Sequence, residues 1–133
     1  MQIIDVIKNS TTPIVTIVTG TAYSAGFFIS IAGHERQAFP HASFLFHQGS
    51  ALVEGDAHKF LQQADNYKST LKAIKKHVLS NTKISTELYD RHKPDDWFMN
   101  AKTALKYGVI DTICSDTNGL LGDDDGEDES DEQ

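Results

Sequence analysis

A serine in this sequence has the surroundings of a catalytic nucleophile. Ser24 is the centre of the motif Ala-Tyr-Ser-Ala-Gly, which follows a β-branched run at residues 14–19 and precedes a compact stretch at residues 27–32. This order predicts a strand, a tight turn of small residues and a helix, and such a turn exposes the hydroxyl beside the helix N-terminus. Unpaired N–H groups and a partial positive charge there would stabilise a developing oxyanion. To act as a nucleophile, the serine also needs a base and an orienting carboxylate.

The candidate base is His47. It ends the apolar run at residues 44–46 and precedes Gln48 and Gly49. A residue at the end of a buried strand lies at the rim of the sheet, where α/β proteins commonly do chemistry. A histidine there is suited to take a proton from a serine and return it to a leaving group; a histidine that merely ends a strand is the alternative. The other five histidines are interpreted as surface or structural residues: His34, His41, His58, His77 and His92.

The candidate acid lies in a pair, Asp95 and Asp96, between Pro94 and the apolar residues 97–99. An acid beside an apolar cluster can be partly buried and can hold an imidazole in the correct tautomer. Two adjacent acids in a loop are otherwise solvated turn residues, and the local sequence does not choose between these interpretations. Because the sequence has neither metal-ligand spacing nor a glycine-rich phosphate loop, we expect no cofactor and no metal.

The elements that would position these residues alternate between strands and helices, which predicts an α/β fold. A helix end at residues 1–8 precedes the first strand, 14–19, and a short helix from residue 25 ends at Gly33, interpreted as a left-handed cap. The remaining predicted elements are a strand pair at 37–39 and 43–46, a long helix at 56–79, a short helix at 85–92, a helix at 101–107 and a strand at 109–113. Asp56 and Asn100 are predicted N-caps.

The long helix carries one continuous apolar stripe on its surface. The stripe residues recur at spacings of three and four: Phe60, Ala64, Tyr67, Leu71, Ile74 and Val78. A helix of this length in a small domain either projects and buries its stripe against another element or subunit, or packs within the monomer. The sequence leaves both alternatives open.

The charge of the chain is concentrated at its C-terminus. The net charge of the 133 residues is −7, but residues 122–133 contain eight acids and no base, which leaves 11 acids against 12 Lys and Arg elsewhere. We expect a disordered acidic tail at 116–133, either solubilising or docking to a basic partner. The lysines of the body are scattered, so no nucleic-acid surface is expected.

The sequence also bounds the compartment. Cys114 is the single cysteine, so no intrachain disulfide can form, and this is compatible with a reducing environment. The first residues are a poor signal peptide, and no stretch approaches the length of a membrane span. We therefore expect a soluble, cytoplasmic chain that has no membrane partner.

From about Met1 to Ser115, the sequence resembles the ClpP family, the proteolytic subunits of the ATP-dependent Clp protease. Residues 20–26 are similar to the family's nucleophile motif Gly-x-Ala-x-Ser-x-Gly, and Phe-His-Gln at 46–48 resembles the strand end that carries its base. Residues 96–101 resemble its segment Asp-x-Phe-(Leu/Met)-(Ser/Asn)-Ala. The order of the motifs and their separations, 23 and 49 residues, are also similar to those of the family.

The resemblance implies a fold and an activity. The fold would be the ClpP/crotonase-like α/β fold, with a parallel sheet, flanking helices and residues 56–79 as a projecting handle helix, in a peptidase domain at 1–115. The activity would be serine-type endopeptidase hydrolysis of unfolded polypeptides, with Ser24 as nucleophile, His47 as base and Asp96, rather than Asp95, as acid. The N–H of Ala25 would contribute to the oxyanion hole. Subunits would form heptameric rings that stack in pairs as tetradecamers, and an AAA+ Clp unfoldase would deliver substrates to them.

The sequence departs from the family pattern in two places. Gly49 replaces the proline that usually follows His-Gln, and the family chain begins several tens of residues earlier, so the N-terminal third is expected to be missing. That third includes a glycine whose N–H completes the oxyanion hole. The chain would then be a fragment or split product, or another segment would supply these parts.

Two other function classes remain open. One is a weakly active or inactive interaction subunit in a mixed assembly, which the missing third favours and the intact candidate triad disfavours. The other is a crotonase-fold enzyme acting on acyl-coenzyme A thioesters. That chemistry usually uses glutamates, which the matching positions of this sequence lack.

Overall fold

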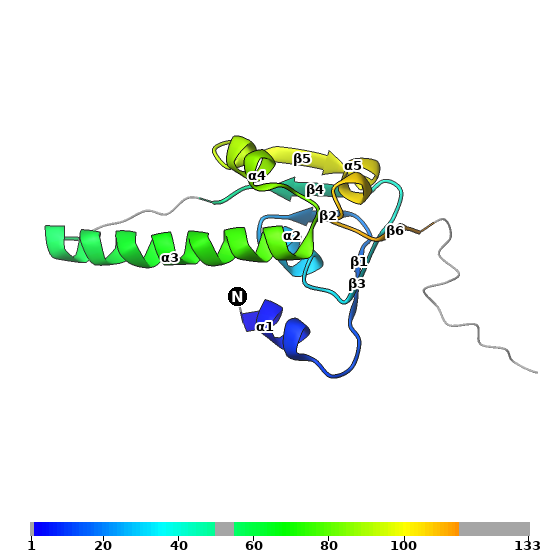
Figure 1. Ribbon diagram of the computed structural model, residues 1–133, viewed down its shortest axis with the longest axis horizontal. Coiled ribbons are helices and arrows are strands. Elements are labelled where there is room, and N and C mark those ends of the chain that lie inside the picture. Colours follow the sequence, from blue (N-terminus) through cyan, green and yellow to red (C-terminus); the bar gives the residue numbers. More distant parts are fainter. Residues whose placement is uncertain (1, 50–54, 115–133) are drawn as a thin grey trace, which may run out of the picture.

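The computed structural model describes residues 2–49 and 55–114, so the predicted acidic tail lies outside the described residues. Helices and mostly parallel strands are mixed along the chain, as in an α/β fold (Figure 1). The elements in chain order are α1 (Gln2–Asn9), β1 (Val15–Val18), β2 (Thr21–Tyr23), α2 (Ala25–Ser30), β3 (Glu35–Ala38), β4 (Ser43–Phe46), α3 (Ala57–Asn81), α4 (Thr86–His92), β5 (Trp97–Asn100), α5 (Ala101–Lys106) and β6 (Thr112–Ile113).

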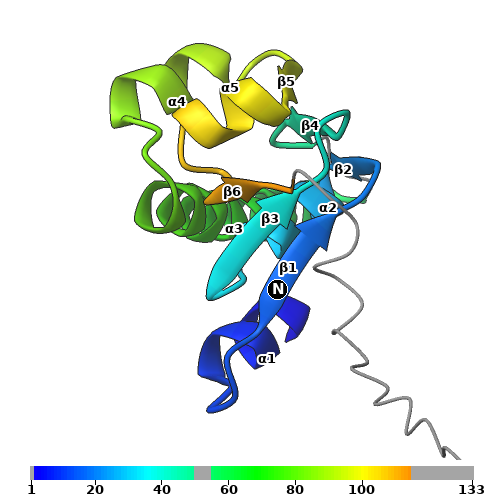
Figure 2. The ribbon, with the colours of Figure 1, turned by 90° about the vertical axis from the view of Figure 1, so that its right-hand side faces the viewer.

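The strands form two small sheets, one with the order β1-β3-β6 and the other with the order β2-β4-β5. All pairs are parallel except β4 with β5. Figure 2 shows β1 and β3 running side by side and passing toward the second sheet. The chain crosses between the sheets at Gly20, and again at residues 39–42, so each later strand lies along an earlier one.

The predicted pairing of residues 37–39 with 43–46 is therefore wrong, although both segments are strands. β3 pairs with β1, and β4 pairs with β2. The physical reason is the crossover through α2, which returns the chain in the same direction and makes parallel neighbours of strands about twenty residues apart.

The core lies where the second sheet meets α2 and α4. Along β4, Phe44 and Phe46 are buried while Ser43 and Leu45 are half-buried, so one face of the strand points inward. The ring of Phe46 lies 5.7 Å from that of Phe27 and 5.1 Å from that of Tyr89, centroid to centroid. This aromatic packing holds the C-terminal end of β4 in place.

The long helix α3 projects from the body (Figure 1), as the resemblance implied. The Asp56 side chain caps its start by accepting a hydrogen bond from Lys59 N at 2.9 Å. Near the C-terminal end of α3, His77 and Val78 are buried, whereas Phe60 and Leu61 near its N-terminal end are 51% and 63% exposed. The first half of the apolar stripe is therefore little covered by the described residues of this chain.

Two predictions at helix and strand ends need correction. Gly33 is not a left-handed cap, because positive φ among the described glycines occurs at Gly49, Gly55 and Gly108. Gly33 is needed for space instead: a Cβ there would lie 2.4 Å from Thr16 Oγ1. The predicted strand at 109–113 is reduced to β6, because the chain leaves α5 through the left-handed Gly108 and turns before it pairs with β3.

Within the described ranges, no helix has both the length and the apolar character that crossing a membrane would require.

Candidate active site

Ser24 occupies a strained turn between β2 and α2. Its backbone has a φ of 52° and a ψ of −116°. In the described part of the chain, Ser24 is the only residue other than glycine with a positive φ. It is the N-cap residue of α2, yet its side chain makes no capping hydrogen bond. A non-glycine residue in this conformation costs about 1–3 kcal/mol, and such strain is concentrated at functional sites. A strained strand-to-helix turn is also how a nucleophilic serine is exposed in unrelated hydrolases.

The backbone around Ser24 fixes the turn from both sides. Ser24 N donates to Leu45 O at 3.2 Å, which joins the turn to β4, and Phe28 N donates to Ser24 O at 3.3 Å, which closes the first turn of α2. Ala25 is the first residue of α2, so its N–H has no acceptor within the helix. This N–H is the donor that the sequence predicted for an oxyanion.

Strand register brings the three candidate residues to one edge of the second sheet. Tyr23 pairs with Leu45, so Ser24 comes level with Phe46, the residue before His47. Phe46 pairs with Trp97 in the antiparallel ladder, and one further step in that register sets His47 opposite Asp96. The order β2-β4-β5 thus becomes the order serine, histidine, acid. Sequence reasoning missed that residues 97–100 form the strand responsible for the last step.

His47 and both acids line one hollow of about 260 Å³ at this edge. Its lining residues are His47, Gln48, Gly49, Lys93, Pro94, Asp95 and Asp96. Asp95 N donates to His92 O at 3.1 Å, and the His92 ring stacks on Trp97 with centroids 4.1 Å apart. These contacts fix the turn that leads into β5, and they therefore fix the position of Asp96 opposite His47.

The hydrogen bond of the imidazole is not the one that a catalytic relay uses. His47 Nδ1 accepts from Gly49 N at 3.1 Å. Because Nδ1 is an acceptor here, the proton of the neutral ring lies on Nε2. Among the hydrogen bonds of residues 2–49 and 55–114, none joins any two of the Ser24 hydroxyl, the His47 ring and the Asp96 carboxylate. The structure therefore gathers the residues at one edge but does not align their side chains.

Two tyrosines hold the segment after His47, and sequence reasoning identified neither as part of the site. Tyr67 Oη donates to Gly49 O, and Gln48 Nε2 donates to Tyr89 Oη, each at 3.1 Å. Burial raises the pKa of the Tyr89 phenol. The sequence pattern places Tyr67 on the apolar stripe, and its hydroxyl is the one signal there of a polar role.

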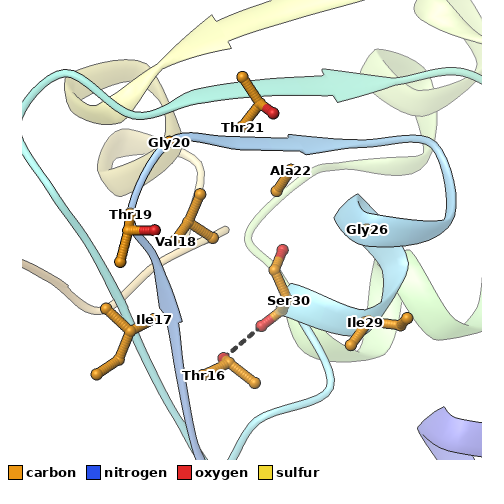
Figure 3. Close-up of a pocket in the computed structure, with 10 residues that line it drawn as sticks. All are labelled: Thr16, Ile17, Val18, Thr19, Gly20, Thr21, Ala22, Gly26, Ile29 and Ser30. Carbon is orange, nitrogen blue, oxygen red and sulfur yellow. Dashed lines mark hydrogen bonds between the residues drawn. The ribbon is translucent and has the colours of Figure 1, made fainter.

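A second hollow, of about 390 Å³, lies between β1, β2 and α2 (Figure 3). Thr16 Oγ1 donates to Ser30 O at 2.7 Å across its base. Its ten lining residues include no titratable side chain, so they offer no acid or base. Within the described residues, no group of three or more His, Cys, Asp or Glu side chains is placed to hold a metal ion.

The fold and the sequence now define the class of protein. A two-sheet α/β body with a projecting helix is compatible with the fold of Clp proteolytic subunits, and the family model described as Clp protease matches residues 1–117. The chain belongs to the Clp protease family.

Curated relatives agree with this assignment. The chain is 35% identical over 106 residues to the ATP-dependent Clp protease proteolytic subunit of Staurastrum punctulatum, covering 77% of this chain and 53% of the relative. It is 32% identical over 123 residues to proteolytic subunit 2 of Corynebacterium diphtheriae, covering 91% and 62%. The corresponding values for the proteolytic subunit of Deinococcus radiodurans are 30% over 124 residues, 92% and 61%. The chain thus spans between half and two thirds of the length of these relatives.

Proposed function

We propose that this chain is a serine-type endopeptidase subunit that hydrolyses peptide bonds of unfolded polypeptides. Ser24 attacks the scissile carbonyl, His47 accepts the serine proton and then gives it to the leaving amine, and Asp96 orients His47. The N–H of Ala25 donates to the oxyanion of the tetrahedral intermediate.

The observation that carries this proposal is the register of β2, β4 and β5. It supports a common edge for Ser24, His47 and Asp96 in the order in which a relay needs them. The strained backbone of Ser24 adds independent support, because no structural role of its side chain, such as a cap, accounts for it.

Assembly and delivery belong to the same proposal. The named relatives are proteolytic subunits of an ATP-dependent protease. We propose that copies of this chain join rings of like subunits, heptamers stacked as tetradecamers, in which the exposed stripe of α3 is covered. An AAA+ Clp unfoldase would supply the substrates and consume the ATP. A cytoplasmic location is part of this proposal.

The direct test is labelling with a fluorophosphonate probe, which reacts with activated serines. We expect labelling of the wild-type chain, complete loss in Ser24→Ala and strong reduction in His47→Ala. Ser43→Ala is the matched control, because Ser43 lies on β4 with its hydroxyl against Tyr23 and should leave labelling in place. Labelling that persists in Ser24→Ala would refute the assignment of the nucleophile.

One observation favours a second candidate, a weakly active or inactive interaction subunit. The contact of Gly49 N with His47 Nδ1 holds the imidazole in the wrong tautomer for a relay. A folded, assembled sample that neither reacts with the probe nor cleaves a fluorogenic peptide would support this candidate over the peptidase.

A further inference from the structure

The three residues after β4 are each held by a hydrogen bond from a different place. His47 Nδ1 accepts from Gly49 N, Gln48 Nε2 donates to Tyr89 Oη in α4, and Gly49 O accepts from Tyr67 Oη in α3. All three donor–acceptor distances are 3.1 Å. Two tyrosines that are distant in the sequence thus help to fix the orientation of one short segment. Tyr89 lies 41 residues after Gln48, and Tyr67 lies 18 residues after Gly49.

We propose that Gly49 and Tyr67 are positioning residues that hold His47 in the Nε2–H tautomer and so restrain the base. The catalytic consequence rests on the proposed function; the tautomer itself does not. In a relay, Nδ1–H donates to the carboxylate and Nε2 accepts from the serine. With Gly49 N–H directed at Nδ1, both ring nitrogens have the opposite roles.

The part played by Gly49 depends on its backbone. Its φ of 77° lies in the left-handed region that favours glycine. This dihedral sets how the peptide unit after Gly49 turns relative to the one before it, whose N–H faces the His47 ring. A proline at this position has no N–H to donate and is fixed at negative φ. The contact therefore depends on the glycine at this position.

The part played by Tyr67 is to keep that N–H in place. Tyr67 Oη donates to the carbonyl of Gly49 itself, so the same residue is held at both its N–H and its C=O. The two peptide units that flank Gly49 are thus each held by a hydrogen bond, so the Tyr67 bond restricts the motion of Gly49. Tyr67 also lies on the apolar stripe of the projecting helix α3 (Figure 1), so a displacement of that helix would weaken the clamp.

Release of the clamp would let the imidazole take up the relay geometry. The ring turns about its Cβ–Cγ bond, Nε2 loses its proton to water and Nδ1 gains one from water, so the ring stays neutral. Nδ1–H then has Asp96 as an acceptor, since Asp96 lines the same hollow and lies opposite His47 in the extended register. Lys93 and Asp95 are the other charged groups of that hollow.

Two variants of the full chain test the inference. Gly49→Pro removes the donor, and Tyr67→Phe removes the clamp while it keeps the ring that packs along α3. Tyr107→Phe is the matched control: among the described residues its hydroxyl makes no hydrogen bond with residues 47–49, and its ring stays packed edge-on against Trp97. If Gly49→Pro fails to fold, Tyr67→Phe decides the question by itself.

The first readout is the tautomer of His47, obtained from the ¹⁵N chemical shifts of its ring at a pH where it is neutral. We expect Nε2–H in the wild type and in the control, and a shift toward Nδ1–H in both variants. A wild-type ring already protonated on Nδ1, or a tautomer unchanged in both variants, would overturn the inference. This readout does not depend on catalysis by Ser24.

The second readout is the rate of fluorophosphonate labelling of Ser24. One hydrogen bond of ordinary net strength corresponds to a change of about fivefold, so we expect labelling about fivefold faster in each variant than in the control. Slower labelling would overturn the inference and make Tyr67 a support of the active geometry. A shifted tautomer without labelling in any variant would uphold the clamp and refute the peptidase.

Discussion

Single residues decide which chemistry this edge of the sheet can perform. Ser24, His47 and the acid pair follow from residue type and neighbours in the sequence, because a small-residue turn after a β-branched run and a histidine at a strand end are local patterns. The tautomer of His47 does not follow from them. It depends on the Gly49 N–H that faces the ring, within a turn where Gly49 has positive φ, and on a tyrosine 18 residues further along the chain.

The adjacent acids allow a matched test at this scale. Asp95 and Asp96 line the same hollow, but the register sets Asp96 opposite His47. We expect Asp96→Asn to lower kcat for a fluorogenic peptide by about 10³–10⁴-fold, because an amide no longer holds the reactive tautomer. Asp95→Asn should change kcat by less than about twofold. Equal losses in the two variants would contradict the assignment.

A buried histidine outside the site predicts a dependence of stability on pH. His77 Nε2 lies 2.9 Å from Phe28 O, and Asn81 Nδ2 lies 3.1 Å from His77 Nδ1, so the ring joins α3 to α2. Burial lowers the pKa of His77, Lys8 acts in the same direction, and the Phe28 carbonyl and Asp5 oppose it.

The sign follows from linkage. Between the lowered pKa in the folded state and the ordinary value near 6.5 in the unfolded state, the unfolded chain binds more protons. The free energy of unfolding therefore falls as the pH falls through this window and levels off below it. We expect His77→Gln, which keeps an N–H for Phe28 O, to lose less stability than the wild type between about pH 7.5 and about pH 5 in urea titrations. If the free energy of unfolding falls equally in the wild type and in His77→Gln over this pH range, protonation of His77 is not the cause of the loss.

At the scale of elements, long and periodic segments are predictable, and short strands are not. The stripe and cap of α3 and the Asn100 cap of α5 are local signals, and the structure confirms both caps. β2 has three residues in what reads as a turn, and β5 has no β-branched residue. Both become strands because β4 lies between them and pairs with each, and this is a tertiary effect.

The cap of α5 is also the end of β5, so it determines where the strand stops. Asn100 Oδ1 accepts from Thr103 N at 2.9 Å. Loss of an N-cap side chain costs about 1 kcal/mol, and we expect Asn100→Ala to lower the free energy of unfolding by about that amount in urea titrations. Asn66→Ala, at an exposed position within α3, should cause no loss. Equal destabilisation by both substitutions would show that the cap has no particular role.

At the scale of the whole molecule, the body and α3 have different requirements. The body buries Phe27, Phe44 and Phe46 within one chain, whereas the projecting half of α3 leaves Phe60 and Leu61 in solvent. Large apolar side chains gathered on one projecting surface usually mark an interface. The proposed ring assembly would cover this surface, and the fold of a single chain offers no other element to do so among the described residues.

This argument predicts that one charge on the stripe dissociates the assembly. We expect the wild type to elute as a multi-subunit species in size-exclusion chromatography with light scattering. Phe60→Glu should shift it to smaller species, because burial of a carboxylate without a partner is strongly unfavourable. Gln62→Glu adds the same charge on the opposite side of α3, two residues along, and should leave the mass unchanged. A wild-type chain that stays monomeric at high concentration, or a Phe60→Glu variant of unaltered mass, would exclude the stripe as the contact between subunits.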